Sequence, residues 1–286
     1  MEEEVVLNNN NIDEKYRGML IDIEAVIEAR NPKLRRRLPN FVINYLKRVL
    51  HQEQTNKFIW ANRDVVGLPY AETIVKYFGA DVTVFGLDNV PDYGRYVFAS
   101  NHPMGGLDGM AFMYAVGQKF QNLKFPVNDL LMFIKNFKDI FLPVNKLGTT
   151  GRKAAELMEE AFASDNQILM FPAGLCSRKQ KGKIVDLQWK KGFVTKAIQS
   201  HRDIVPVYIS GRNSNFFYNL SNIRKFFGVK ANIEMIYLVD EMYKQYGQHV
   251  DVYFGKPVKW QSIENLNPKE VVEDIKKTVY SLCDKK

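Results

Sequence analysis

The spacing of hydrophobic residues changes near residue 80, from a purely helical period to a mixture of strands and helices. Before that point, apolar residues recur every three or four positions over 12–27, 34–50 and 70–78, which predicts amphipathic helices. Asn31-Pro32 ends the first helix, and Pro39 fits the first turn of the second, where its missing N–H does no harm. We therefore expect residues 1–79 to form a helical layer.

From residue 80 onward, apolar runs of strand length alternate with helical segments. Strands are predicted at 81–85, 95–100, 167–171, 204–209, 233–239 and 250–254, and helices at 109–118, 152–163, 192–200 and 268–283. Two apolar pieces, 130–134 and 140–144, fit either type of element. The alternation implies an α/β fold over residues 80–286, with a mostly parallel central sheet flanked by helices and the N-terminal helices added to it.

Charge and cysteine content narrow the classes of function. The formal net charge of +8 favours anionic partners, such as a lipid surface or an acidic substrate. No nucleic-acid-reading motif is present, so we expect no nucleic-acid partner. The only cysteines are Cys176 and Cys283, which is typical of a reducing compartment. The acidic N-terminus does not resemble a secretory signal, and no apolar run reaches the ~18 residues that a spanning helix needs.

Basic residues cluster in the second predicted helix. Arg35, Arg36, Arg37, Lys47 and Arg48 surround its apolar face, which suits an anionic bilayer surface. A helix packed on the core with a solvated charged side is the alternative interpretation. The first interpretation makes residues 1–79 a membrane-associating segment and the protein a peripheral one.

Residues 100–109, Ser-Asn-His-Pro-Met-Gly-Gly-Leu-Asp-Gly, connect a predicted buried strand to a predicted helix. His102 lies where the strand ends, and Asp108 lies where the helix begins. A neutral imidazole can take a proton from a hydroxyl, and a carboxylate can hold its other ring nitrogen. Gly105 and Gly106 allow the turn between them to close tightly. The alternative is a loop histidine with local hydrogen bonds and an aspartate that caps the helix.

A second loop follows another predicted buried strand, at residues 171–179, Phe-Pro-Ala-Gly-Leu-Cys-Ser-Arg-Lys. Pro172 and Gly174 place it at the carboxyl end of the strand, where open α/β sheets hold ligands and where backbone N–H groups can face an oxyanion. Cys176 fits either a nucleophile beside the histidine or a small buried residue. Three side chains are candidates for binding an anionic group: Ser177, Arg178 and Lys179. An ordinary basic surface loop is the alternative.

These motifs resemble those of the glycerolipid (lysophospholipid) acyltransferases, in which a strand leads into Asn-His and, after a short gap, Asp. Asn101, His102 and Asp108 stand in those positions. The resemblance spans residues 81–258. Further blocks similar to the family lie at 86–91, 141–145, 171–177, 191–192, 204–208 and 255–258.

The chain departs from the family pattern at several positions. The gap between His102 and Asp108 is five residues where the family has four, and the doubled glycine can absorb the extra residue in a bulge. Ala173 and Cys176 stand where the family has a glutamate and an arginine, and Asn145 replaces a phosphate-contacting arginine. Because those family residues bind glycerol phosphate, the pattern favours the bacterial branch that acylates lyso-aminolipids, the ornithine and glycine lipids.

The resemblance implies an O-acyltransferase of phospholipid and glycerolipid metabolism, at the cytoplasmic face of the inner membrane. His102 would act as general base and Asp108 would hold it, with acyl carrier protein or coenzyme A as the thioester donor and with no metal or other cofactor. The expected substrate-binding residues are Asn101, Gly105, Gly106, Asn145, Gly174, Ser177, Arg178 and Lys179. The alternatives are a conventional lysophosphatidate acyltransferase, a non-catalytic lipid- or carrier-binding protein, and a hydrolase with Cys176 as nucleophile.

Overall fold

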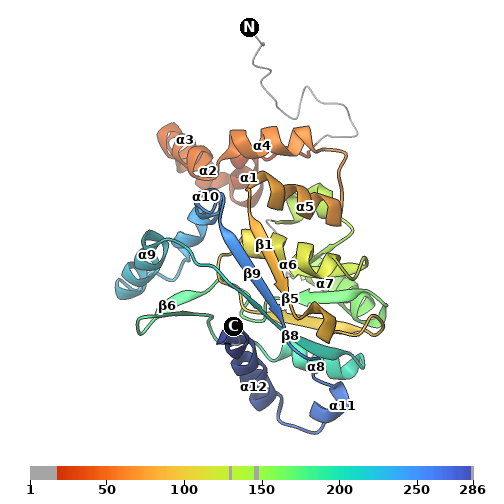
Figure 1. The fold of residues 1–286 in the computed structure, drawn as a ribbon. Helices are drawn as coiled ribbons and strands as arrows, with labels where there is room; N and C mark the ends of the chain where they lie inside the picture. The colour runs from red at the N-terminus through yellow and green to blue at the C-terminus, as the bar shows by residue number, and fades with distance from the viewer. Residues whose placement is uncertain (1–17, 129–130, 145–147, 285–286) are drawn as a thin grey trace.

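The computed structural model describes residues 18–128, 131–144 and 148–284, which form a seven-stranded sheet with helices on both sides (Figure 1). The strand order is β1-β9-β8-β2-β5-β3-β4. The strands are β1 (Asp81–Phe85), β2 (Tyr96–Ser100), β3 (Leu123–Val127), β4 (Phe141–Pro143), β5 (Gln167–Met170), β8 (Asp203–Ile209) and β9 (His249–Phe254). Neighbouring strands are parallel except β8 and β9. The predicted α/β fold with a mostly parallel sheet is confirmed.

Two hydrophobic layers sandwich the sheet. On one face pack α5 (Leu68–Tyr77) and α6 (Leu107–Gly117), and on the other pack α7 (Gly148–Ala163), α8 (Gly192–Gln199) and α12 (Pro268–Ser281). The central strand β2 alternates between them: Phe98 joins the first layer, and Val97 and Ala99 join the second. A strand buried on both faces reads as a continuous apolar run, which is how β2 appears in the sequence.

The N-terminal helices are more broken than the hydrophobic pattern predicted. They are α1 (Ile23–Arg30), α2 (Pro32–Arg37), α3 (Asn40–Val49) and α4 (Gln52–Ala61). The single helix expected over 34–50 is interrupted at Leu38-Pro39, because a residue before proline avoids the helical region and Leu38 is extended. Pro39 caps α3 with an extended backbone of its own. Of the helix expected from residue 12, the part up to residue 17 lies outside the described residues. No helix in the described ranges is long and apolar enough to cross a bilayer.

A small helical group connects β8 to β9: α9 (Asn215–Phe226), the 3-10 helix η6 (Ile233–Tyr237) and α10 (Leu238–Lys244). The strand predicted at 233–239 is wrong, because a short apolar run does not distinguish strand from helix and this one forms η6 and the start of α10. A hairpin of β6 (Arg178–Gln180) and β7 (Lys183–Val185) contacts α9. The remaining short helices are η3 (Leu87–Asn89), η4 (Leu131–Phe133), η5 (Lys135–Phe137), α11 (Trp260–Ile263) and η7 (Leu282–Asp284).

The strands β2, β5 and β8 are neighbours and run in the same direction. Their carboxyl ends, at Ser100, Met170 and Ile209, therefore meet at one edge of the sheet. The loops that follow them lie together at this edge, which is where ligands bind in open α/β sheets.

Candidate active site

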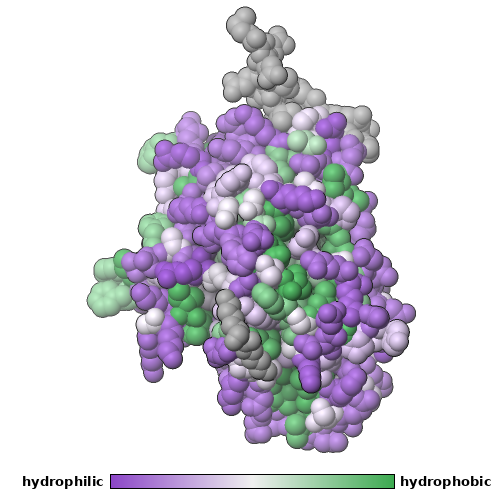
Figure 2. Space-filling view, viewed as in Figure 1, coloured by the Kyte–Doolittle hydropathy of each residue, from purple (hydrophilic) through white to green (hydrophobic). Residues whose placement is uncertain are grey.

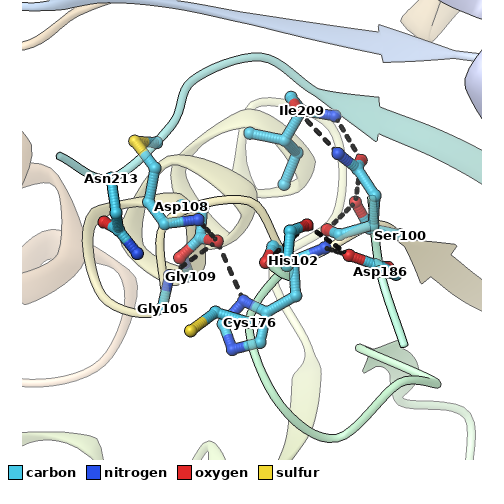
Figure 3. A network of polar contacts seen from close by, with 12 residues as sticks. Ser100, His102, Gly105, Asp108, Gly109, Cys176, Asp186, Ile209 and Asn213 are labelled. Carbon is cyan, nitrogen blue, oxygen red and sulfur yellow. Dashed lines mark hydrogen bonds and ion pairs between the residues drawn. The ribbon is translucent and has the colours of Figure 1, made fainter. Parts of the chain in front are cut away.

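The turn between β2 and α6 brings His102 and Asp108 into direct contact (Figure 3). Nδ1 of His102 lies 2.9 Å from Oδ2 of Asp108. The carboxylate is fully buried, whereas the imidazole keeps 17% of its side-chain surface exposed. With Nδ1 engaged by the carboxylate, Nε2 is the ring nitrogen that can accept a proton from a hydroxyl. The five-residue gap therefore allows the contact.

The backbone of the turn holds the carboxylate of Asp108 in place. Oδ2 accepts hydrogen bonds from the N–H groups of Met104 and Gly105 at 2.8 and 3.0 Å, and Oδ1 accepts one from Gly109 at 3.0 Å. Burial acts to raise the pKa of Asp108, but the charge and hydrogen bond of His102 and the backbone hydrogen bonds from Gly105 and Met104 outweigh it, so the pKa is lowered. The carboxylate is thus kept ionised beside the imidazole. Its hydrogen bonds both hold the turn together and orient His102.

Gly105 makes the bulge possible. Its φ is +87°, and a Cβ there would lie 2.8 Å from Cδ2 of Leu238 on α10. The backbone conformation and the close approach both require a residue without a side chain. Gly106 is similarly near α10, since a Cβ there would lie 3.2 Å from Sδ of Met242.

An aromatic ring fixes the plane of the imidazole. The rings of Phe171 and His102 are stacked, with centroids 3.9 Å apart and planes at 13°. Phe171 follows β5 and packs in turn against Phe112 of α6 and Phe125 of β3. The second loop, predicted to lie at the carboxyl end of its strand, thus contacts the histidine through its first residue, Phe171.

Two of the predicted substrate-binding residues, Asn101 and Arg178, instead form hydrogen bonds inside the protein. Asn101 is buried, and its side chain exchanges two hydrogen bonds with the backbone of Ile209, at 2.7 and 2.8 Å, which fastens the end of β2 to the end of β8. Arg178 was expected to bind an anionic group, but it points into the protein, with 1% of its side chain exposed and Nη2 2.9 Å from Oε1 of Glu234. Neither placement fits the expected substrate contact, because both side chains use their polar atoms internally.

Cys176 has the character of a buried structural residue. It is fully buried, and burial raises the pKa of its thiol to about 12. Because the thiolate is the nucleophilic form, a thiol with this pKa is inert near neutral pH. The structure thus argues against a hydrolase built on this residue.

The other candidates are placed as follows. Ser177 is buried; its N–H donates to the carbonyl oxygen of His102 at 2.7 Å. Lys179 is exposed on β6. The N–H of Gly174 donates to the carbonyl oxygen of Phe171 at 2.9 Å, and the N–H of Gly105 donates to the carboxylate of Asp108. Both N–H groups therefore form hydrogen bonds within their own loops and do not face an oxyanion. Asn145 lies outside the described residues.

Sequence reasoning missed Asp186, which lies just after β7. Its Oδ1 accepts hydrogen bonds from the backbone N–H of His102 at 3.2 Å and from the hydroxyl of Ser177 at 2.6 Å, and its Oδ2 accepts one from the indole of Trp189 at 2.8 Å. One signal in the sequence could have found it: Asp186 is the only acidic residue in a lysine-rich stretch from 177 to 192.

A buried carboxylate that orients a partly exposed imidazole, at the ligand-binding edge of an α/β sheet, defines an enzyme site suited to base-assisted group transfer. A family model described as acyltransferase matches residues 25–285, and the chain belongs to this acyltransferase family. The family membership expected from the motifs is confirmed, and the protein is an acyltransferase enzyme.

Two similar proteins carry the name lyso-glycine lipid O-acyltransferase. The one from Phocaeicola vulgatus is 44% identical over 265 residues, covering 92% of this chain and 95% of its own. The one from Bacteroides thetaiotaomicron is 43% identical over 265 residues, covering 92% and 97%. A solved structure, the 1-acyl-sn-glycerophosphate acyltransferase from Thermotoga maritima, covers 76% of this chain and 81% of its own, with 19% identity and a TM-score of 0.47.

Proposed function

We propose that this enzyme transfers a fatty acyl group from a thioester to the hydroxyl of a lyso-lipid, and that the lyso-lipid is a lyso-glycine lipid or a related lyso-aminolipid. The observation that carries the proposal is the 2.9 Å contact between His102 and Asp108 in a chain of the acyltransferase family. The acceptor is supported by the names of the two relatives with 44% and 43% identity, each aligned over 92% of this chain.

The chemistry needs one proton relay. Nε2 of His102 takes the proton of the acceptor hydroxyl as its oxygen attacks the thioester carbonyl carbon. The tetrahedral intermediate then collapses, the C–S bond breaks, and the imidazolium returns the proton to the departing thiolate. Asp108 keeps Nδ1 protonated and stabilises the imidazolium in between. We propose direct transfer without an acyl-enzyme intermediate, which the complete burial of the Cys176 thiol supports.

The charges around the second loop suit a carboxylate head group. A Cβ on Gly174 would lie 3.2 Å from Nζ of Lys190, so this ammonium lies against the loop that carries Phe171. Lys190 and Lys179 are exposed, whereas Arg178 is held by Glu234. A glycine head group offers one carboxylate, which a single ammonium can match, and Ala173 leaves the loop without an acidic side chain that would repel it.

The donor and the location are part of the same proposal. The thioester is acyl carrier protein or acyl-coenzyme A, both anionic, and the net charge of +8 favours the encounter with either. We propose a peripheral location on the cytoplasmic face of the inner membrane, which the basic residues of α2 and α3 support because they suit an anionic bilayer surface. The bilayer is where a lyso-lipid acceptor is dissolved.

A direct assay tests the proposal. The purified protein is given acyl carrier protein or coenzyme A thioesters together with lyso-glycine lipid or lysophosphatidate, and the products are identified by mass spectrometry. We expect acylated glycine lipid, reduced at least about 10²-fold in His102→Ala and unchanged in His249→Ala, whose exposed imidazole pairs with Asp81 of β1 and Asp251 of β9. Preference for lysophosphatidate would favour the conventional enzyme, and a folded protein that binds lipid without transfer would favour the non-catalytic alternative.

A further inference from the structure

Helix α9 buries one face and exposes another, and the exposed face is also apolar. The buried face holds Phe217 and Tyr218, which are fully inaccessible. Positions 216, 223 and 227 follow the i, i+7, i+11 spacing of a single helical stripe. We define the α9 ridge as this stripe together with Phe226, which adjoins it. The exposed fractions of the four side chains are 49% for Phe216, 55% for Ile223, 85% for Phe226 and 72% for Phe227.

The ridge continues onto the N-terminal helices. The ring of Phe216 packs against Tyr237 at 5.0 Å, and the hydroxyl of Tyr237 lies 2.7 Å from that of Tyr45 on α3. Phe41, one turn earlier on α3, is 73% exposed. The elements α3, α10 and α9 follow one another along one side of the molecule in Figure 1, and Figure 2 shows hydrophobic surface at the protruding end of α9 on that side.

The charged side chains of the segment that carries the ridge are all positive. Residues 211–233 contain Arg212, Arg224, Lys225 and Lys230 and no acidic side chain. Arg224 is buried against Glu234, and the other three are exposed. On α3, Arg48 lies over the ring of Tyr45 at 5.5 Å. The carboxylates of Asp240 and Glu241 near Phe216 are both paired with Lys244, whose ammonium lies 5.6 Å from the centre of the Phe216 ring. Exposed aromatic residues with exposed cations at their border complement a bilayer, which has an apolar interior and, when its lipids are anionic, a negative surface.

We propose that the α9 ridge is a membrane-contact surface, which inserts its aromatic side chains into the headgroup and acyl boundary of an anionic bilayer. Apolar patches of this kind mark interaction sites, and a protruding apolar stripe with lysines beside it is the pattern of an interfacial helix. The proposal extends the membrane attachment by α2 and α3 to a second element that lies far from them in the sequence.

Contact at the ridge brings the bilayer close to the catalytic turn. The group that follows α9 reaches that turn directly, since Leu238 and Met242 of α10 lie against Gly105 and Gly106. On its buried side, Phe217 of α9 packs with Cys176 of the second loop. The elements that carry the ridge are therefore in direct contact with the turn and the loop that hold His102.

Vesicle flotation tests the proposal with the full-length protein. The variant Phe226→Ser with Phe227→Ser is compared with a matched variant, Tyr93→Ser with Leu266→Ser, which removes two other exposed apolar side chains, outside α3 and the α9 group. Burial of one phenylalanine changes an equilibrium by roughly tenfold or more. We therefore expect the ridge variant to bind phosphatidylglycerol-containing vesicles at least about tenfold more weakly, and the matched variant to bind like the wild type.

A spectroscopic measurement keeps the test independent of any folding defect. In Phe226→Trp the ring is retained, and the added emission should shift to shorter wavelength with anionic vesicles and be quenched by brominated lipids. Unchanged flotation of the serine variant, or a tryptophan that stays in water, overturns the proposal. Weaker binding to acyl carrier protein with normal vesicle binding would instead make the ridge a protein-docking surface. Transfer to lyso-lipid dispersed in detergent should persist in the ridge variant, which separates this proposal from the acyltransferase activity.

Discussion

Asp186 holds the backbone of His102, although 84 positions separate them in the sequence. The same carboxylate accepts from Ser177 and from Trp189, and its own N–H donates to the hydroxyl of Tyr280 on α12 at 2.8 Å. The catalytic turn is therefore fastened twice, by Asp108 through the imidazole and by Asp186 through the main chain (Figure 3). We infer that Asp186 is a positioning residue for the base.

Replacing Asp186 with asparagine tests this role. Asparagine keeps one acceptor oxygen but turns the other into an amide, which leaves one of the buried donors unpaired. We expect kcat to fall about tenfold or more, because small displacements of a catalytic group have large effects on rate, while KM changes little. The free energy of unfolding should decrease by about 1–3 kcal/mol. Steady-state kinetics and urea denaturation give the two quantities.

The matched control is Asp274→Asn, which removes an exposed aspartate that pairs with Lys277 on the surface of α12. This control should leave kcat and the free energy of unfolding close to those of the wild type. A loss of stability in Asp186→Asn with no change in kcat would show that the carboxylate serves folding alone, which would rule out positioning.

Gly105→Ala should damage the catalytic turn selectively. The added methyl group would meet Leu238 at 2.8 Å in a backbone with φ of +87°. Gly182→Ala is a closely matched control, because φ there is +82° and nothing lies within 4 Å of the new carbon. Both variants carry the backbone cost of about 1 kcal/mol, but only Gly105→Ala should also lose activity, by at least about tenfold. Equal kinetics in the two variants would contradict the requirement for close packing at the bulge.

Asp108→Asn should separate orientation of the base from binding of the lipid. The amide can still accept from the turn, but it no longer stabilises the imidazolium or fixes the tautomer that leaves Nε2 basic. We expect kcat to fall about 10²–10⁴-fold with KM for the lyso-lipid nearly unchanged. A variant with full kcat would show that His102 works without its carboxylate. Binding of the lyso-lipid by calorimetry provides the check that the site is intact.

The sequence predicted the sheet and the catalytic pair well, for a physical reason. A strand buried on both faces, such as β2, must be apolar throughout, and the glycines of the following turn leave few ways to connect it to α6. His102 and Asp108 are only six positions apart, so local geometry decides their contact. Their roles in catalysis stay predictions until the variants are measured.

Contacts between residues far apart in the chain could not be predicted from the sequence. The motif predicts Arg178 as a solvent-exposed cation. Only the fold shows that Arg178 is buried and pairs with Glu234, 56 positions away. The same glutamate lies in the apolar run 233–239, whose pattern predicts a strand but which forms η6 and the start of α10. Asp186 has no periodic pattern around it, so its contact with His102 could be seen only once β6 and β7 had been placed. Residues whose partners lie on other elements carry little local signal.

Glu234 links the second loop to α9, and its removal should be costly. Its carboxylate is fully buried between Arg178 and Arg224, with Oε1 2.9 Å from Nη2 of Arg178. Glu234→Gln leaves two guanidinium groups without their counter-charge, and breaking a buried pair costs about 3–5 kcal/mol. Glu53→Gln, which breaks an exposed pair with Lys57, should cost less than about 1 kcal/mol in the same urea titration.

The pKa of Glu234 determines how the destabilisation caused by Glu234→Gln depends on pH. Burial acts to raise this pKa, but the hydrogen bonds and charges of the two arginines outweigh it, so the folded-state pKa lies below its ordinary value. A carboxyl with a lowered pKa contributes stability that is present above the unfolded-state pKa, about 4.3, and is lost as the pH falls through the folded-state pKa. The gap in unfolding free energy between wild type and Glu234→Gln should therefore be full at pH 7 and narrow below about pH 4. A gap of constant size down to pH 3 would mean that the ion pair contributes nothing beyond packing.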